Sequence, residues 1–302
     1  MMDANRIRAA SEVQAIQGVN MYDAGRWLAE IYDSLTEDEN GDVACLEGLV
    51  RSISGREDPP LCILEPFCGT GRLTLPLASM GHVLTGMDIS PDMLERFECK
   101  RIQAGLPEKS VRLFACNVLD AEWAGPYDVV VLGCNCLYEL GTPDDQATCI
   151  RKAWDALSPG GCLYLDGDHM EGDLPLSWQQ TGVVETAMEG STEDGSLVRA
   201  TRETIWFDAP KRLARFLRRT TVRMADGTVR AYECTQQKHP VSAREVESWL
   251  SECGFAVLGR YGDWCQAPFS FDGPRMVFWA QKPLQTALSR LPHQWVRMTL
   301  NS

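Results

Sequence analysis

Apolar runs and amphipathic stretches alternate along the first half of the chain. The apolar runs have the length of strands buried on both faces of a sheet, and they cover 61–67, 82–90, 111–118, 127–137 and 161–168. The stretches between them have the 3.6-residue period of helices, at 71–81, 90–105 and 144–157. Strands separated by such helices predict an α/β fold with a doubly wound, parallel sheet.

The pattern differs on either side of this region. Residues 11–36 and 43–53 are predicted to be helical, because their apolar residues fall on one face. Residues 169–195 are polar and are predicted to be mostly irregular. Strand-like stretches follow, with a hairpin turn at 225–227, and they predict an inserted antiparallel β element. After it come a helix whose Ser242 and Glu245 form a capping box and two closing strands.

Composition narrows the class of protein. The 302 residues carry a net charge of −13, which disfavours non-specific binding to nucleic acid. No apolar run is long enough to span a bilayer, and the N-terminus lacks the apolar segment of a secretory signal, so we expect a cytoplasmic protein without a membrane partner. The twelve cysteines include no Cys-x-x-Cys pair and the four histidines stand far apart, which argues against a metal site.

The candidate chemistry centres on the segment LEPFCGTGR. Gly69 and Gly71 lie where the first predicted strand leads into a helix, and glycines there let the backbone approach a ligand closely. The next strand ends at Asp88, at the spacing expected for a carboxylate that accepts bonds from ribose hydroxyls. A nucleotide-like ligand is therefore predicted. Thr74 stands where a nicotinamide fingerprint has its third glycine or an alanine, which disfavours NAD.

The segment ILEPFCGTGRLTLPLASMGHVLTGMDISPDML resembles the first two motifs of class I S-adenosylmethionine-dependent methyltransferases. YDVVVLGCNCLYEL, ALSPGGCLYLDG and the closing strands resemble later motifs, so the likeness spans roughly residues 20 to 283. It implies a mostly parallel, seven-stranded, Rossmann-like sheet with the inserted antiparallel β element. The expected domains are an N-terminal helical lid (1–58), the core (59–169 and 241–283), a substrate-capping insertion (170–240) and a C-terminal tail (284–302).

The resemblance also implies how the cofactor, S-adenosylmethionine, is bound. Glu65 and the two glycines are expected near its methionine part, Asp88 at the ribose, and Ile89 on the adenine. The expected contacts in full are Tyr22, Glu65, Phe67, Gly69, Gly71, Arg72, Asp88, Ile89, Met93, Asn117, Val118 and Cys134. Two positions depart from the family pattern: Phe67 replaces a glycine, and Asn117 replaces an aspartate.

The family places the methyl acceptor above the fourth and fifth strands. His169 is the candidate general base there and Tyr138 the candidate catalytic residue that orients the acceptor. The expected substrate contacts are Asn135, Tyr138, His169, Trp206 and Trp264, with the tryptophans in an aromatic wall for a planar or cationic substrate. A structural role in packing or capping is open for each of these side chains.

The leading hypothesis is transfer of a methyl group to N, O or S of a small molecule by in-line displacement, in a monomer or homodimer. One alternative is an RNA or protein methyltransferase, supported only by the basic run KRLARFLRRTTVR. A second is an NAD(P)-dependent oxidoreductase. A third is a non-catalytic cofactor-binding subunit, left open by Phe67 and by the lack of an evident base.

Overall fold

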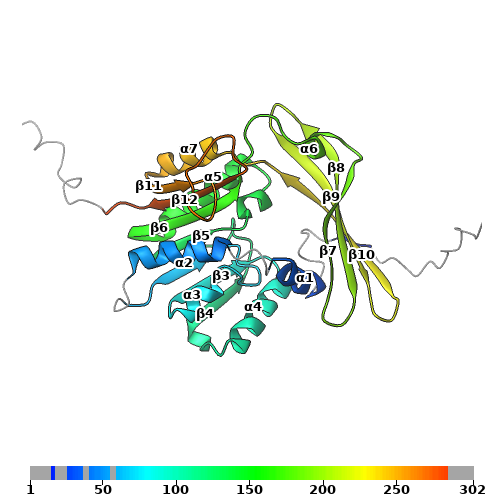
Figure 1. Cartoon of the computed structure of the whole chain (residues 1–302), viewed down its shortest axis with the longest axis horizontal. Coiled ribbons are helices and arrows are strands. Elements are labelled where there is room, and N and C mark those ends of the chain that lie inside the picture. Colours follow the sequence, from blue (N-terminus) through cyan, green and yellow to red (C-terminus); the bar gives the residue numbers. More distant parts are fainter. Residues whose placement is uncertain (1–14, 18–25, 37–40, 55–58, 285–302) are drawn as a thin grey trace, which may run out of the picture.

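The computed structural model of the chain describes residues 15–17, 26–36, 41–54 and 59–284 (Figure 1). Its larger part is a seven-stranded sheet with the order β11-β12-β6-β5-β2-β3-β4. The strands are β2 Cys62–Glu65, β3 Val83–Asp88, β4 Val111–Ala115, β5 Tyr127–Leu132, β6 Leu157–Asp168, β11 Ala256–Tyr261 and β12 Arg275–Gln281. Strands β2 to β6 pair in parallel, whereas β12 is antiparallel to both β6 and β11. The predicted fold class is confirmed.

Helices cover both faces of this sheet. Ile63 and Leu64, neighbours on β2, belong to opposite apolar clusters, and Val129 and Val130 of β5 divide in the same way. One cluster includes α5 (Pro143–Ala156) and α7 (Ala243–Cys253); the other includes α2 (Gly41–Ile53), α3 (Leu75–Ser79) and α4 (Pro91–Gln103). Burial on two faces explains why the strands read as continuous apolar runs rather than as alternating patterns.

A second sheet stands beside the first (Figure 1). Its order is β1-β10-β9-β8-β7, and its strands are β1 Ala15–Gln17, β7 Val184–Ser191, β8 Leu197–Asp208, β9 Leu213–Arg223 and β10 Val229–Lys238. The hairpin turn predicted at 225–227 joins β9 to β10, and there the Met224 amide donates to the Thr228 carbonyl at 2.8 Å.

Two predictions of secondary structure are wrong in this sheet. Strand β7 forms within the stretch predicted to be irregular; its residues are mostly exposed, so the sequence shows no apolar alternation. Strand β1 lies inside the predicted helix 11–36, whose described helical part, α1 (Arg26–Thr36), begins only at Arg26. The three residues of β1 pair with β10 and take their conformation from that partner and not from local periodicity.

Helix α1 packs between the second sheet and α4 (Figure 1). Leu28 and Ile31 are buried against the sheet, Leu28 beside Cys234 and Ile31 beside Val222. The shorter helical elements are η2 Glu108–Ser110, η3 Cys136–Glu139 and α6 Leu176–Gln179. Within the described ranges, no helix is both long enough and apolar enough to cross a bilayer.

Candidate active site

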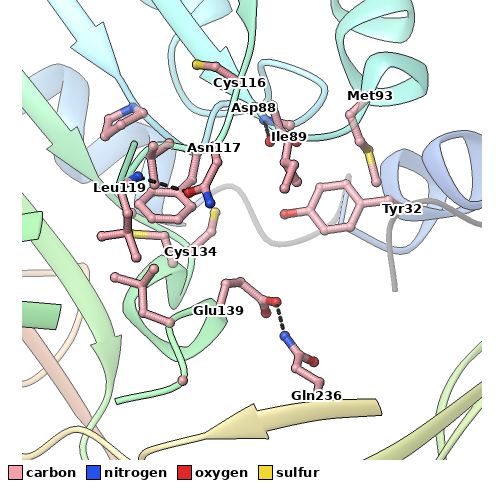
Figure 2. Close-up of a pocket in the computed structure, with 18 residues that line it drawn as sticks. Tyr32, Asp88, Ile89, Met93, Cys116, Asn117, Leu119, Cys134, Glu139 and Gln236 are labelled. Carbon is pink, nitrogen blue, oxygen red and sulfur yellow. Dashed lines mark hydrogen bonds between the residues drawn. The ribbon is translucent and has the colours of Figure 1, made fainter. Parts of the chain in front are cut away.

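A cavity of about 290 Å³ opens at the carboxyl ends of the parallel strands (Figure 2). Loops after β2, β3, β4 and β5 supply most of its wall, and α1 and β10 supply the rest. The lining residues that the sequence analysis expected at the cofactor are Phe67, Gly69, Asp88, Ile89, Met93, Asn117, Val118 and Cys134. Carboxyl ends of parallel strands meet at one edge of a sheet, which is why residues so far apart in the chain converge here.

Asp88 ties the glycine turn to the end of β3. Its two carboxylate oxygens accept the backbone N–H groups of Gly69 and Ser90, each at 2.9 Å. Ser90 in turn caps α4, as predicted, by accepting the Met93 amide. Burial raises the pKa of Asp88, although the two amides oppose that effect. A carboxylate has about four lone-pair positions, so Asp88 retains acceptor capacity for a ligand in the cavity.

The turn after β5 has an unusual backbone. Cys134 and Asn135 have φ values of 54° and 60°, in the left-handed region that non-glycine residues seldom adopt. Asp166 of β6 accepts the Cys134 amide at 2.6 Å, and the Asn135 side chain accepts the Asp168 amide. These bonds hold a conformation that presents Cys134 to the cavity. Asn135 was expected to contact the substrate, but its side-chain oxygen is used to hold this turn.

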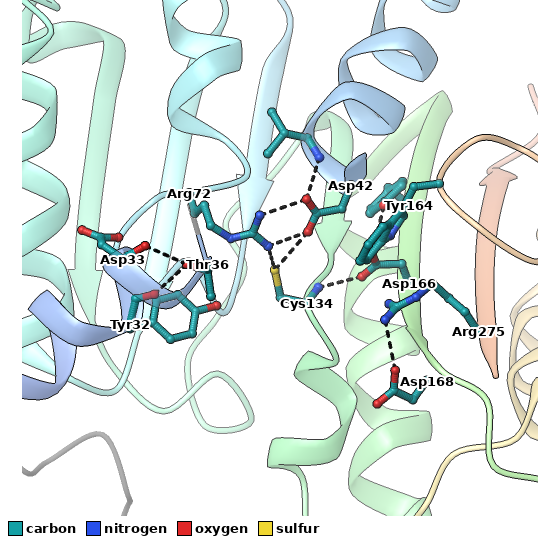
Figure 3. Close-up of polar contacts among 12 residues, drawn as sticks. Tyr32, Asp33, Thr36, Asp42, Arg72, Cys134, Tyr164, Asp166, Asp168 and Arg275 are labelled. Atoms are coloured by element: carbon teal, nitrogen blue, oxygen red, sulfur yellow. Dashed lines mark hydrogen bonds and ion pairs between the residues drawn. The ribbon is translucent and has the colours of Figure 1, made fainter. Parts of the chain in front are cut away.

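Arg72 does not line the cavity; it lies beside Asp42 and Cys134 (Figure 3). Its guanidinium donates both terminal nitrogens to Asp42 of α2 and also contacts the Cys134 thiol. Asp42 is 1% exposed, so the pair is buried and fixes α2 against the glycine turn. The expected contact of Arg72 with the cofactor is thus replaced by an ion pair within the protein.

Glu65 and Gly71 also support the turn from outside the cavity. Glu65 is buried, and the Thr74 hydroxyl donates to its carboxyl at 2.5 Å. Gly71 has φ +76°, and a Cβ there would lie 2.6 Å from the ring of Phe97. Both residues therefore shape the loop that carries Gly69, and neither lines the cavity.

The two residues expected to be catalytic lie away from the cavity. His169 is 7% exposed, its Nδ1 accepts the Ala243 amide at 3.1 Å, and its Nε2 lies 3.1 Å from the Phe271 carbonyl. With both ring nitrogens engaged, it caps the junction of β6 and α7 and has no free nitrogen to act as a base. The Tyr138 hydroxyl donates to the Asp168 carbonyl, and its ring packs against Trp178.

The expected aromatic wall is not formed. The Trp264 indole donates to Asp166 at 2.8 Å, and the Arg275 guanidinium lies 4.0 Å from its ring centroid. Trp206 is 37% exposed on the second sheet, under the guanidinium of Arg215. Neither tryptophan lines the cavity. Tyr22 lies outside the described residues.

Three polar residues of the cavity were missed by the sequence analysis: Tyr32 from α1, Glu139 from η3 and Gln236 from β10 (Figure 2). Tyr32 falls on the apolar face of the helix predicted at 11–36, and nothing in that pattern marks it as a cavity residue. Glu139 lies in the segment GCNCLYEL, which was expected near the acceptor, but no spacing distinguished it. Gln236 reaches the cavity because β10 returns to the core edge, which no local pattern reveals. The remaining lining residues are Pro66, Cys116, Leu119, Gly133, Cys136, Leu140 and Gly141.

Comparison with known proteins agrees with this architecture. The family model described as "Methyltransferase domain" matches residues 63–161. The ubiquinone biosynthesis O-methyltransferase of Xanthomonas axonopodis pv. citri (strain 306) is 24% identical over 66% of this chain and 78% of its own length. A crystal structure of an S-adenosylmethionine-dependent methyltransferase from Clostridium acetobutylicum ATCC 824 has a TM-score of 0.64 at 16% identity and covers 85% of this chain and 98% of its own.

The sugar N-methyltransferase KedS8 from Streptoalloteichus sp ATCC 53650 has a TM-score of 0.63 at 16% identity, covering 91% of this chain and 98% of its own. Sheet order and cavity position agree with the family match. Residues 63–161 form a methyltransferase domain, and the chain has the fold of S-adenosylmethionine-dependent methyltransferases, whose cofactor is S-adenosylmethionine.

Proposed function

We propose that this enzyme transfers the methyl group to a nitrogen, oxygen or sulfur atom of a small molecule by in-line displacement. One observation carries the proposal: eight of the twelve residues expected at the cofactor line a single cavity, which continues past them to Tyr32, Glu139 and Gln236. The cofactor supplies a methyl group already activated by the sulfonium charge. The protein then has to bind, orient and exclude water.

The cavity fits the cofactor in its chemical character. Asp88 would hold the ribose hydroxyls, Ile89 and Met93 one face of the adenine, and Asn117 its edge, where the side-chain carbonyl would accept from the adenine amine. The Asn117 carbonyl oxygen already accepts the Leu119 amide at 3.0 Å, which fixes its orientation. Gly69 and Cys134 would face the methionine part.

Orientation of the acceptor toward the methyl group would account for most of the rate enhancement. Holding the nucleophile in line with the methyl group, in a site closed to water, can contribute about 7–11 kcal/mol. Tyr32 and Gln236 close the cavity from the two elements outside the core, α1 and the second sheet. The positions of Tyr32 and Gln236 support the proposed assignment of 1–58 as a lid and of 170–240 as a substrate-capping insertion.

A small acceptor is favoured over RNA or a protein by the arrangement of the basic run. On β9, Arg218 is buried on one face of the sheet, whereas Arg215 and Arg219 are exposed on the other. Arg212 donates to the carbonyls of Gly172 and Met170. The run is thus divided between two faces, and its exposed charges are partly neutralised, because Arg219 pairs with Glu233 and Lys211 lies 3.9 Å from Asp208. The small-molecule relatives named above support the same choice.

Calorimetric titration with S-adenosylhomocysteine tests the cofactor site. We expect Asp88→Ala to weaken binding by about 1–3 kcal/mol, because the ribose hydroxyls lose a charged acceptor. Glu95→Ala is the matched control: this carboxylate lies on α4, is exposed, and lines no part of the cavity. Equal affinity of Asp88→Ala and wild type would refute the placement of the ribose, and absence of any binding heat in wild type would refute the proposed function.

A further inference from the structure

The charges that line the cavity are all negative. Among its described lining residues, only Asp88 and Glu139 are charged at neutral pH, and no lysine, arginine or histidine side chain is among them. Asp88 lies at the end assigned to the ribose. Glu139 lies at the other end, facing Tyr32 across the cavity and beside Gln236 (Figure 2). An anionic acceptor would therefore meet no positive lining residue at this end, whereas a cationic or N–H-rich acceptor would meet a carboxylate.

Contacts from the second sheet hold Glu139 in its charged form. Lys238 contacts one carboxylate oxygen at 3.0 Å, and the Gln236 amide donates to the other at 2.7 Å. Burial opposes ionisation, but the ion pair with Lys238 and the bond from Gln236 outweigh it and lower the pKa of Glu139. The Glu139 side chain is 25% exposed, against 10% for Lys238. The carboxylate thus keeps an accessible side and lone pairs for a ligand.

Gln236 orients the carboxylate at the same end. Its side-chain amide donates to Glu139 at 2.7 Å, whereas its side-chain oxygen is buried, so Glu139 is the acceptor that a ligand in the cavity can reach. A carboxylate suits a ligand atom that both donates a hydrogen and gains positive charge during transfer, as an amine nitrogen does.

We propose that Glu139 is the acceptor-binding residue of this enzyme and that the methyl acceptor presents an amine nitrogen to it. This inference rests on the function proposed above and makes it specific: the enzyme is an amine N-methyltransferase. Glu139 accepts one N–H of the amine and so turns the nitrogen lone pair toward the methyl group.

The step balances without a co-reactant. The nitrogen lone pair forms the new N–C bond, the C–S bond breaks, and its electron pair stays on sulfur. Positive charge moves from sulfur to nitrogen, and the methylated ammonium later releases its proton to solvent. A carboxylate beside the nitrogen stabilises the charge that develops there. A hydroxyl acceptor would instead need a base to take its proton, and a carboxylate kept ionised by Lys238 is a weak base.

The test compares two cofactor analogues and needs no acceptor. S-adenosylhomocysteine is neutral at sulfur, whereas sinefungin carries an ammonium group on the carbon that replaces the sulfur, next to the acceptor position. We expect wild type to bind sinefungin about tenfold more tightly than S-adenosylhomocysteine, because the ammonium gains a charge-assisted bond to Glu139. In Glu139→Gln the ratio of the two dissociation constants should fall to near one, with the affinity for S-adenosylhomocysteine within about threefold of wild type.

Two further variants keep the result interpretable. Glu139→Gln leaves the Lys238 charge buried without its partner, so the double variant E139Q/K238M removes both charges and should show the same loss of preference. Glu233→Gln is the matched control, because this glutamate lies on β10, as Lys238 does, but pairs with Arg219 of β9 outside the cavity. An unchanged ratio in both Glu139 variants would overturn the inference but not the proposed function. Failure of wild type to bind S-adenosylhomocysteine would overturn the function itself.

Discussion

A single buried carboxyl, Glu65, ties the stability of the core to pH. It ends β2, is 5% exposed, and receives the Thr74 hydroxyl. Burial is the main cause that raises its pKa to about 8, and Asp88 and Asp42 add to the effect. The folded protein therefore keeps this proton over a range of pH in which the unfolded chain has lost it.

Replacing Glu65 with glutamine should flatten the pH dependence of stability. The contribution from protonated Glu65 is complete below its ordinary pKa of 4.5 and is lost as pH rises toward about 8. Between pH 5.5 and 7.5 the free energy of unfolding of wild type should fall by roughly 2 kcal/mol more than that of Glu65→Gln. Urea unfolding at several pH values measures this difference. Glu95→Gln, an exposed control, should follow wild type; parallel curves for all three proteins would refute the assignment.

The glycine turn between β2 and α3 depends on a third element, α4. Gly71 combines a φ of +76° with the ring of Phe97 close to where a Cβ would lie. Gly105, just past α4, also has positive φ, +67°, but nothing lies within 4 Å of the corresponding position. A comparison of these two glycines therefore separates the cost of a positive φ from the cost of steric overlap with Phe97.

Alanine at these two positions should therefore have different effects. Gly105→Ala should lower the free energy of unfolding by about 1 kcal/mol, from the left-handed conformation alone. Gly71→Ala adds overlap with Phe97 and should be worse by about a further 1–3 kcal/mol. Chemical denaturation of both variants gives the comparison. The double variant G71A/F97L should recover part of the difference, and equal losses in the two single variants would show that the contact with Phe97 is unimportant.

The elements that were predicted correctly are those whose structure follows from a local pattern in the sequence. The strands of the core are buried on both faces, and the caps at Ser90 and Ser242 follow from local hydrogen bonding. Strand β7 lacked such a signal because it is an exposed edge strand. The side chains from the predicted loops after β2, β3 and β5 largely reached the cavity, whereas His169 did not, because the fold used both its nitrogens.

The cavity exists only because three parts of the molecule meet. The core supplies most of the wall, β10 brings Gln236, and α1 brings Tyr32. Local periodicity reports which face of a helix is apolar but not which neighbour will cover it, so the sequence could not place Tyr32 or Gln236 in the site. Long-range polar contacts fix these parts to one another. The most concentrated of them joins α1 to the core through Asp33.

Loss of the Asp33 charge should loosen α1 and weaken the site with it. Asp33 is 4% exposed and accepts from Thr70 at 2.6 Å, from Arg96 at 2.8 Å and from Lys100 at 2.9 Å. Burial works against its charge, but these three bonds prevail and lower its pKa. Asp33→Asn would leave both cations without this partner and should lower the free energy of unfolding at pH 7 by about 3 kcal/mol.

The direction in which the stability difference changes with pH shows whether the Asp33 charge is its cause. A lowered pKa gives stability that is present above the ordinary value of 3.8 and is lost as pH falls through the lower, folded value. The difference between wild type and Asp33→Asn should therefore shrink below pH 3.8, as followed by urea unfolding. Affinity for S-adenosylhomocysteine should fall too, since the same helix carries Tyr32 into the cavity. Glu30→Gln on α1 is the control, because this acid lies 4.0 Å from the exposed Arg26, and it should change stability by less than about 0.5 kcal/mol. An equal loss in Glu30→Gln and Asp33→Asn would mean that α1 is held by its apolar face alone.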